Sequence, residues 1–185
     1  DYPEIIELDK SVDRLKCHLD ALEILHGYKL APSMKFFNAF ETAISSSGNE
    51  GREYTIYLEQ GKEILDNICR KFIANQQYSS TQDSIAKLRD DLEYVRIAIS
   101  GISEEDMNEL LLKHSLGSRF YNVGKIIIEK SVLSPDAVER IILSAAIEYY
   151  NSAAGSYDQT IDTAKEILNL APVLNDDVLR ELHLI

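Results

Sequence analysis

The stretch IAKLRDDLEYVRIAISG, residues 85–101, decides the fold class. Its apolar side chains recur three and four residues apart, the spacing that places them on one face of an α-helix, at Ile85, Leu88, Leu92, Val95 and Ile99. Gly101 is expected to end this helix. Since the regular spacing lasts only about two heptads, and a coiled coil sustains three or four, the pattern favours a helix whose apolar face packs in a core.

The same spacing recurs along most of the chain, and the strict alternation typical of β-strands is nearly absent. The first helix, which Gly27 is expected to end, carries an apolar stripe at Val12, Leu15, Leu19, Leu22 and Leu25. Further helices are expected over residues 32–44, 52–75, 103–117, 118–127, 134–150, 161–170 and 175–182. Counted with the helix of residues 85–99, the pattern predicts about nine helices.

Two of these helices begin with recognisable capping signals. Ser103 is followed by three acidic residues, which favour the first turn because the helix dipole is positive there. Ser134 precedes Pro135, a residue well suited to the first helical position. Both serines are therefore predicted to be N-caps.

The connections between the expected helices are short, so consecutive helices should pack as antiparallel hairpins. We predict an all-α fold, an irregular α-solenoid of antiparallel helix hairpins that forms a single segment over residues 1–185. The polar run at residues 75–82 is expected to be a longer loop, and two lobes divided near it are an alternative. A closed helical bundle is the other arrangement that hairpins allow.

The last residues of the chain are apolar at helical spacing. A terminal solenoid repeat needs a polar outer face, so this stripe is expected to be the interface with a continuing solenoid. The residues assigned to that interface are Val178, Leu182, Leu184 and Ile185.

The charge balance restricts the class of partner. The chain has 19 Lys and Arg against 31 Asp and Glu, a formal net charge of −12. This charge disfavours binding to nucleic acid and adsorption to anionic membranes, both of which depend on Lys and Arg. No apolar run approaches the length of about 20 residues that spans a bilayer, and no leader-like segment opens the chain, so direct membrane insertion is not expected.

The sequence offers no catalytic or metal-binding pattern. Four histidines, His18, His26, His114 and His183, lack metal-ligand spacing and are interpreted as helix-edge or C-terminal-turn residues. The paired acidic residues are interpreted as solvated caps, and Gly61 is interpreted as a site of close helix packing, as is Gly124. Cys17 and Cys69 are expected to be reduced thiols. We therefore predict a protein-interaction module, with no enzymatic activity, cofactor or metal.

The C-terminal third resembles a known family. Residues 138–153, VERIILSAAIEYYNSA, form an apolar helix that ends in an aromatic pair followed by Asn-Ser, and AKEILNL at 164–170 follows after a short loop. Pro172 and the ending ELHLI at 181–185 complete the pattern, and residues 15–28 and 109–120 add weaker matches upstream. These segments resemble the Sec-type α-solenoid domain of the neuroblastoma-amplified sequence protein and the Dsl tethering-complex subunits.

The resemblance implies a function that the residues alone do not. Members of this family are scaffold subunits of an endoplasmic-reticulum tether that captures vesicles in Golgi-to-ER retrograde transport. The resemblance thus implies protein partners, namely a zeste-white-type tether subunit and an ER t-SNARE. It also implies a cytoplasmic location, peripheral to the endoplasmic reticulum.

Other functions stay open on the sequence. The same fold would suit a generic helical-repeat adaptor or a kinetochore-type scaffold. A self-contained helical bundle that binds a small ligand or phosphopeptide would need Lys and Arg converging in a groove. An all-α enzyme would need a histidine and a carboxylate brought together by folding.

Overall fold

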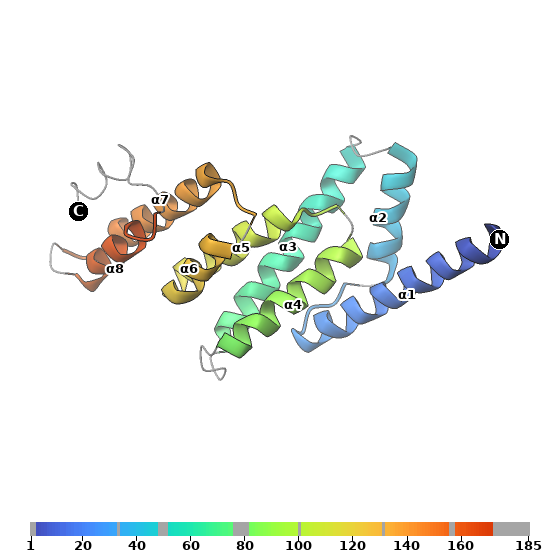
Figure 1. The fold of residues 1–185 in the computed structure, drawn as a ribbon, viewed down its shortest axis with the longest axis horizontal. Coiled ribbons are helices and arrows are strands. Elements are labelled where there is room, and N and C mark those ends of the chain that lie inside the picture. The colour runs from blue at the N-terminus through green and yellow to red at the C-terminus, as the bar shows by residue number, and fades with distance from the viewer. Residues whose placement is uncertain are drawn as a thin grey trace. The chain divides into compact units, whose positions relative to one another are not determined.

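The computed structural model describes residues 3–32, 34–47, 52–75, 82–99, 101–130, 132–155 and 158–171. These residues form eight α-helices and no strand, which confirms the predicted all-α class (Figure 1). In chain order they are α1 (Pro3–Gly27), α2 (Met34–Ser47), α3 (Arg52–Ala74), α4 (Gln82–Ile99), α5 (Glu104–Gly117), α6 (Tyr121–Lys130), α7 (Pro135–Asn151) and α8 (Gln159–Leu168).

The eight helices coincide with eight of those expected from the sequence. The ninth, expected over residues 175–182, lies outside the described residues. So do all four residues assigned to a continuing solenoid, Val178, Leu182, Leu184 and Ile185, and that assignment stays a prediction.

The chain divides into two compact units, residues 1–107 and residues 108–185. The division falls inside α5, between Met107 and Asn108. The polar run at 75–82, near which a two-lobe division was an alternative, belongs to the first unit, and residues 76–81 lie outside the described part.

Helix α4 is at the centre of the first unit, because it packs against both α1 and α3. Its predicted stripe is buried at Leu88, Leu92, Val95 and Ile99, and Ile85 is half-buried. On the α3 side, a Cβ atom added to Gly61 would lie 2.8 Å from Cγ2 of Ile99. The predicted close packing at Gly61 is thereby confirmed, and it lets α3 cover the stripe of α4.

The apolar stripe expected on α1 is exposed for most of its length. Val12, Leu15 and Leu19 are exposed, and only Leu25 at its end is fully buried. The face of α1 that packs in the unit instead carries His18, Ala21 and Leu25, about a third of a turn around the helix from the stripe. Because this packing face has a histidine and a small alanine, it was less conspicuous in the sequence than the stripe.

The second unit has its core between α7 and α8, which pack closely against each other. Both helices begin with a capping side chain: the Ser134 hydroxyl accepts a hydrogen bond from the Ala137 amide, and Asp158 accepts one from Thr160. The predicted N-cap at Ser134 is therefore confirmed. In the first unit, the Ser103 hydroxyl accepts a bond of 3.0 Å from the Asp106 amide, which confirms the other predicted N-cap.

Helices α1 and α5 end in the same way. The amides of Leu30 and Phe120 donate 2.8 Å hydrogen bonds to carbonyls five residues back, at Leu25 and Ser115. This is the Schellman arrangement, which needs a residue in the left-handed conformation just before the donor. Glycine usually fills that position, but here Lys29 has φ of 55° and Arg119 has φ of 62°.

Candidate protein-interaction surface

The described residues contain no candidate metal centre. Within them, no group of three or more His, Cys, Asp or Glu side chains is placed to hold a metal ion. No described helix combines the length and the apolar character needed to cross a membrane. The search for a functional site therefore turns to the packing of individual side chains and to the surface.

His18 differs from its predicted place at a helix edge, because its side chain is buried. Only 4% of the residue is exposed, its ring stacks on Phe37 with centroids 4.9 Å apart, and its Nε2 lies 3.5 Å from Oε1 of Glu41. Burial lowers the pKa of His18, and the nearby Glu41 carboxylate opposes this shift only in part. His18 thus acts as a core residue between α1 and α2.

The remaining histidines and the cysteines show no sign of a site. His26 lies in the last turn of α1 and His114 in the last turn of α5, as predicted, and His183 lies outside the described residues. Both cysteines are free thiols. Burial raises the pKa of Cys69 to about 12 and also raises that of Cys17, so neither thiol is activated as a nucleophile.

The most unusual surface feature is an exposed apolar row on α1, which we call the α1 stripe and define as Ile5, Leu8, Val12, Leu15 and Leu19. Their exposed fractions are 56%, 64%, 57%, 49% and 53%. The residues follow one another at intervals of three, four, three and four, so they lie on one face of the helix. A contiguous row of large exposed apolar side chains of this kind marks a site of protein or membrane interaction.

The N-terminal half of α1 has little packing of its own. Every residue from 5 to 16 is exposed, including Ile6, which lies off the stripe. In Figure 1 this half of the helix, drawn in dark blue, extends past α2. The α1 stripe is therefore accessible along its length to another helix.

Charged side chains border the α1 stripe on one side. Helical geometry places five exposed charged residues along this border, and four of the five are acidic: Asp9, Asp13, Lys16, Asp20 and Glu23. The opposite border carries Ser11 and the exposed Glu7, and the cation of Arg14, farther around the helix, is paired with Glu41, with Nε 3.1 Å from Oε1. The accessible border is thus predominantly negative.

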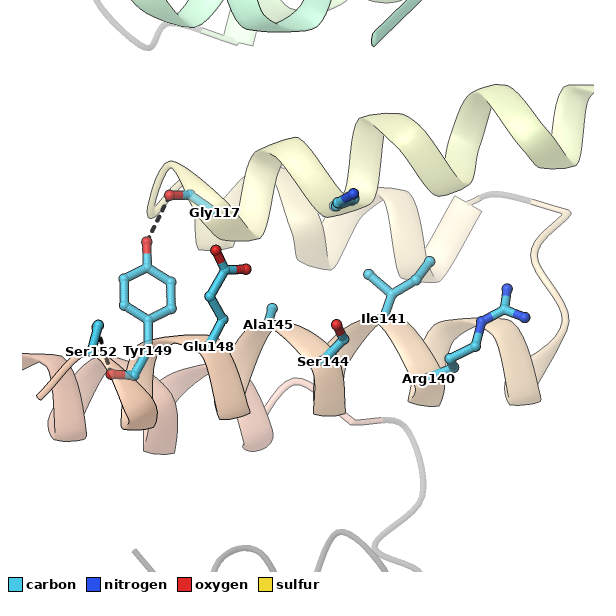
Figure 2. Close-up of a pocket in the computed structure, with 9 residues that line it drawn as sticks. Gly117, Arg140, Ile141, Ser144, Ala145, Glu148, Tyr149 and Ser152 are labelled. Atoms are coloured by element: carbon cyan, nitrogen blue, oxygen red, sulfur yellow. Dashed lines mark hydrogen bonds between the residues drawn. The ribbon is translucent and has the colours of Figure 1, made fainter. Parts of the chain in front are cut away.

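A groove between α5 and α7 is the second candidate site, and it lies wholly in the second unit (Figure 2). Its volume is about 430 Å³, and its lining includes Lys113, Arg140, Ser144, Glu148 and Tyr149. At one end the Tyr149 hydroxyl donates a 2.7 Å hydrogen bond to the Gly117 carbonyl (Figure 2). Arg140 lies toward the other end.

The charges of this groove do not favour an anionic ligand. Nη2 of Arg140 lies 2.7 Å from Oε1 of Glu109, so this cation is already paired. Glu148 adds a carboxylate to the lining. Lys113 and Arg140 both line the groove, but Glu148 and the pairing of Arg140 with Glu109 offset their charge, so the lining has no excess of positive charge for a phosphate.

A second groove, also of about 430 Å³, lies in the first unit at the end of α1. It is lined by Tyr28, Phe72, Lys87 and Asp91 among others, and the Tyr28 hydroxyl donates a 2.8 Å hydrogen bond to Asp91. This bond joins the end of α1 to α4, so it has a structural role in the unit.

The sequence contained a signal for the α1 stripe that the prediction did not use. The 3-4 spacing extends upstream of Val12 to Leu8 and Ile5, well beyond the point where His18, Ala21 and Leu25 supply a packing face. An apolar row longer than the packing face beside it indicates that the row has another role.

Comparisons of this chain with protein-family models, with curated proteins and with solved structures give no match.

Proposed function

We propose that this chain is a protein-interaction scaffold, one section of an α-solenoid in a subunit of an ER vesicle-tethering complex. In this role it would act in Golgi-to-ER retrograde transport on the cytoplasmic side of the endoplasmic reticulum. Its partners would be a zeste-white-type tether subunit and an ER t-SNARE.

The observation that carries the scaffold part of the proposal is the α1 stripe. Five large apolar side chains, each about half exposed or more, lie on one face of a helix whose other face packs in the unit. A scaffold binds partner helices through such surfaces.

The choice of a tether rests on the resemblance together with the helices that carry it. Residues 138–153 make up most of α7, and residues 164–170 make up the second half of α8 and its end. These two helices pack as consecutive partners, the arrangement that stacked hairpins of a solenoid would need. A kinetochore-type scaffold or a generic helical adaptor would share this packing, so only partner identity distinguishes them.

The proposal is tested by co-elution in size-exclusion chromatography and by titration calorimetry. The chain would be mixed with the zeste-white-type tether subunit and, separately, with the cytosolic region of the ER t-SNARE. A t-SNARE cytosolic region from the plasma membrane serves as the matched control. Binding to either tether partner but not to the control supports the proposal. Failure to bind both, by protein whose helicity is verified by circular dichroism, contradicts it.

A further inference from the structure

The α1 stripe has the geometry of a helix-pairing seam. From Ile5 to Leu19 it extends along about 21 Å of helix at 1.5 Å per residue. Alternating intervals of three and four residues are the spacing of the a and d positions of a heptad, whose side chains insert between those of a facing helix. The stripe therefore fits another helix better than an extended peptide.

The border charges indicate what kind of helix fits. In a helix pair, the residues beside the apolar seam meet the corresponding residues of the partner and determine which partner is accepted. Beside the α1 stripe these residues are Asp9, Lys16 and Glu23, with Asp13 and Asp20 in the next row outward. A partner helix whose seam is bordered mainly by Lys and Arg would be complementary to them.

We propose that the α1 stripe binds an amphipathic helix of another protein, with an apolar seam at 3-4 spacing bordered by Lys and Arg. This inference rests on the proposed role as an interaction scaffold and specifies the chemistry of one partner.

The same charges argue against two other occupants. A second copy of this chain carries the same border of four acidic residues and one lysine, so a pair of copies would bring net negative charge to both of its sides, which disfavours the pair. Helices that lie on anionic membranes carry Lys and Arg on their polar face, whereas this border is acidic. A basic helix is the occupant that satisfies both the apolar seam and its border.

The test uses two designed helical peptides of 21 residues with the same Leu and Ile seam. One carries Lys at the bordering positions, and the other carries Glu. Binding to the 185-residue chain is measured by fluorescence anisotropy at low and at physiological salt. The Lys-bordered peptide is expected to bind at least about tenfold more tightly, with a difference that shrinks as salt is added. Equal binding of the two peptides overturns the proposal.

Variants of α1 locate the binding surface. Leu8→Asp places a charge in the seam and is expected to weaken binding of the Lys-bordered peptide by at least about tenfold. Ile6→Asp is the matched control, because Ile6 is an exposed apolar residue of the same turn that lies off the stripe. Both side chains are exposed, so both variants should keep the helicity and the melting temperature of the parent chain. If the two variants lose affinity for the Lys-bordered peptide equally, or if Leu8→Asp loses none, the proposal is overturned.

A charge-reversal variant tests the border directly. Asp9→Lys combined with Glu23→Lys is expected to move the preference from the Lys-bordered to the Glu-bordered peptide. A preference that does not change means that the border does not select the partner, and the proposal fails.

Other occupants would give different results. Dimerisation in sedimentation equilibrium, or flotation with anionic vesicles, that Leu8→Asp abolishes would assign the stripe to a second copy or to a membrane. If a longer polypeptide containing these residues does not bind the peptide while the 185-residue chain does, another helix of the same polypeptide covers the stripe. Each of these results overturns the proposal.

The failure of this inference is distinguishable from the failure of the proposed function. If the tether partners co-elute equally with the parent chain and with Leu8→Asp, the tether function stands and the inference about the stripe fails. If the Lys-bordered peptide binds through the stripe while neither tether partner binds, the inference stands and the tether function fails.

Discussion

Helices α1 and α4 carry the same apolar pattern but have opposite surroundings. In both helices large apolar residues follow at intervals of three and four. In α4 the row is buried from Leu88 to Ile99, whereas in α1 the row from Ile5 to Leu19 is exposed. Helix α4 packs against α1, α2 and α3, and α1 uses a different face for its contact with α4. The pattern therefore predicts the helix and its apolar face, but not what covers that face.

The largest expected difference between the two helices is the effect of leucine truncation. Leu92→Ala in α4 removes a fully buried side chain and should lower the free energy of unfolding by about 2–5 kcal/mol. Leu15→Ala in α1 removes a half-exposed side chain and should change it by less than about 0.5 kcal/mol. Urea denaturation followed by circular dichroism measures both. Similar losses in the two variants would show that the α1 stripe is buried in solution.

The second prediction concerns the packing of α3 against α4, which a substitution at Gly61 should disturb. Gly61→Ala introduces a Cβ atom 2.8 Å from Cγ2 of the fully buried Ile99, and such overpacking should cost about 1–3 kcal/mol. Gly27→Ala in α1 is the control, because a Cβ there meets no atom within 4 Å. Gly27→Ala should be neutral or slightly stabilising, since alanine favours the helix. A Gly61→Ala variant as stable as the parent would contradict the close packing of α3 and α4.

The free energy of unfolding should depend on pH through His18 on the packing face of α1, whereas the uncharged side chains of the α1 stripe should not contribute to this dependence. Burial lowers the pKa of His18 in the folded protein, so the unfolded chain takes up a proton first as the pH falls. Above the unfolded pKa of about 6.5 both states are neutral at His18, and below it the folded state loses stability. The free energy of unfolding should therefore fall between about pH 7 and pH 5. The His18→Gln variant should lose the part of this fall that is due to His18.

The matched control for this experiment is His26→Gln, since His26 is exposed in the last turn of α1 and this variant keeps His18. Denaturation midpoints of the parent and of both variants would be measured at several pH values. An equal pH dependence in the parent chain and in His18→Gln would show that His18 is not buried in the neutral form.

The sequence predicted the helices well because their signals are local. The spacing of apolar residues and the caps at Ser103 and Ser134 all act within one helix, and the structure agrees with each of them. Close packing at Gly61 was also predicted, because an isolated glycine inside a helix is typical of it, and the structure adds that the partner is Ile99. The exposure of the apolar stripe of α1 was not predicted, because what covers a helix face depends on residues far away in the sequence.

The burial of His18 could not be inferred for a similar reason. Its environment comes from Phe37 and Glu41 on α2 and from the backbone of Ala98 on α4. No spacing within α1 indicates that these residues meet the histidine. Surface sites formed by one helix are thus easier to recognise in a sequence than core contacts between helices, provided that the apolar row is compared with the packing face beside it.

The smallest expected effect concerns the end of α1, where Lys29 has a positive φ of 55°. Lys29→Gly relieves this left-handed conformation, and after the extra entropy of glycine in the unfolded chain it should raise the stability by about 0.5–1 kcal/mol. Arg119→Gly at the corresponding position after α5 should gain less, because its guanidinium lies 5.8 Å from the centre of the Tyr149 ring and this contact is lost. Binding of the Lys-bordered peptide to Lys29→Gly should be unchanged, because the substitution alters how α1 ends and leaves the α1 stripe intact. If stability and peptide binding changed together in this variant, the packing of α1 and the exposure of its stripe would be coupled.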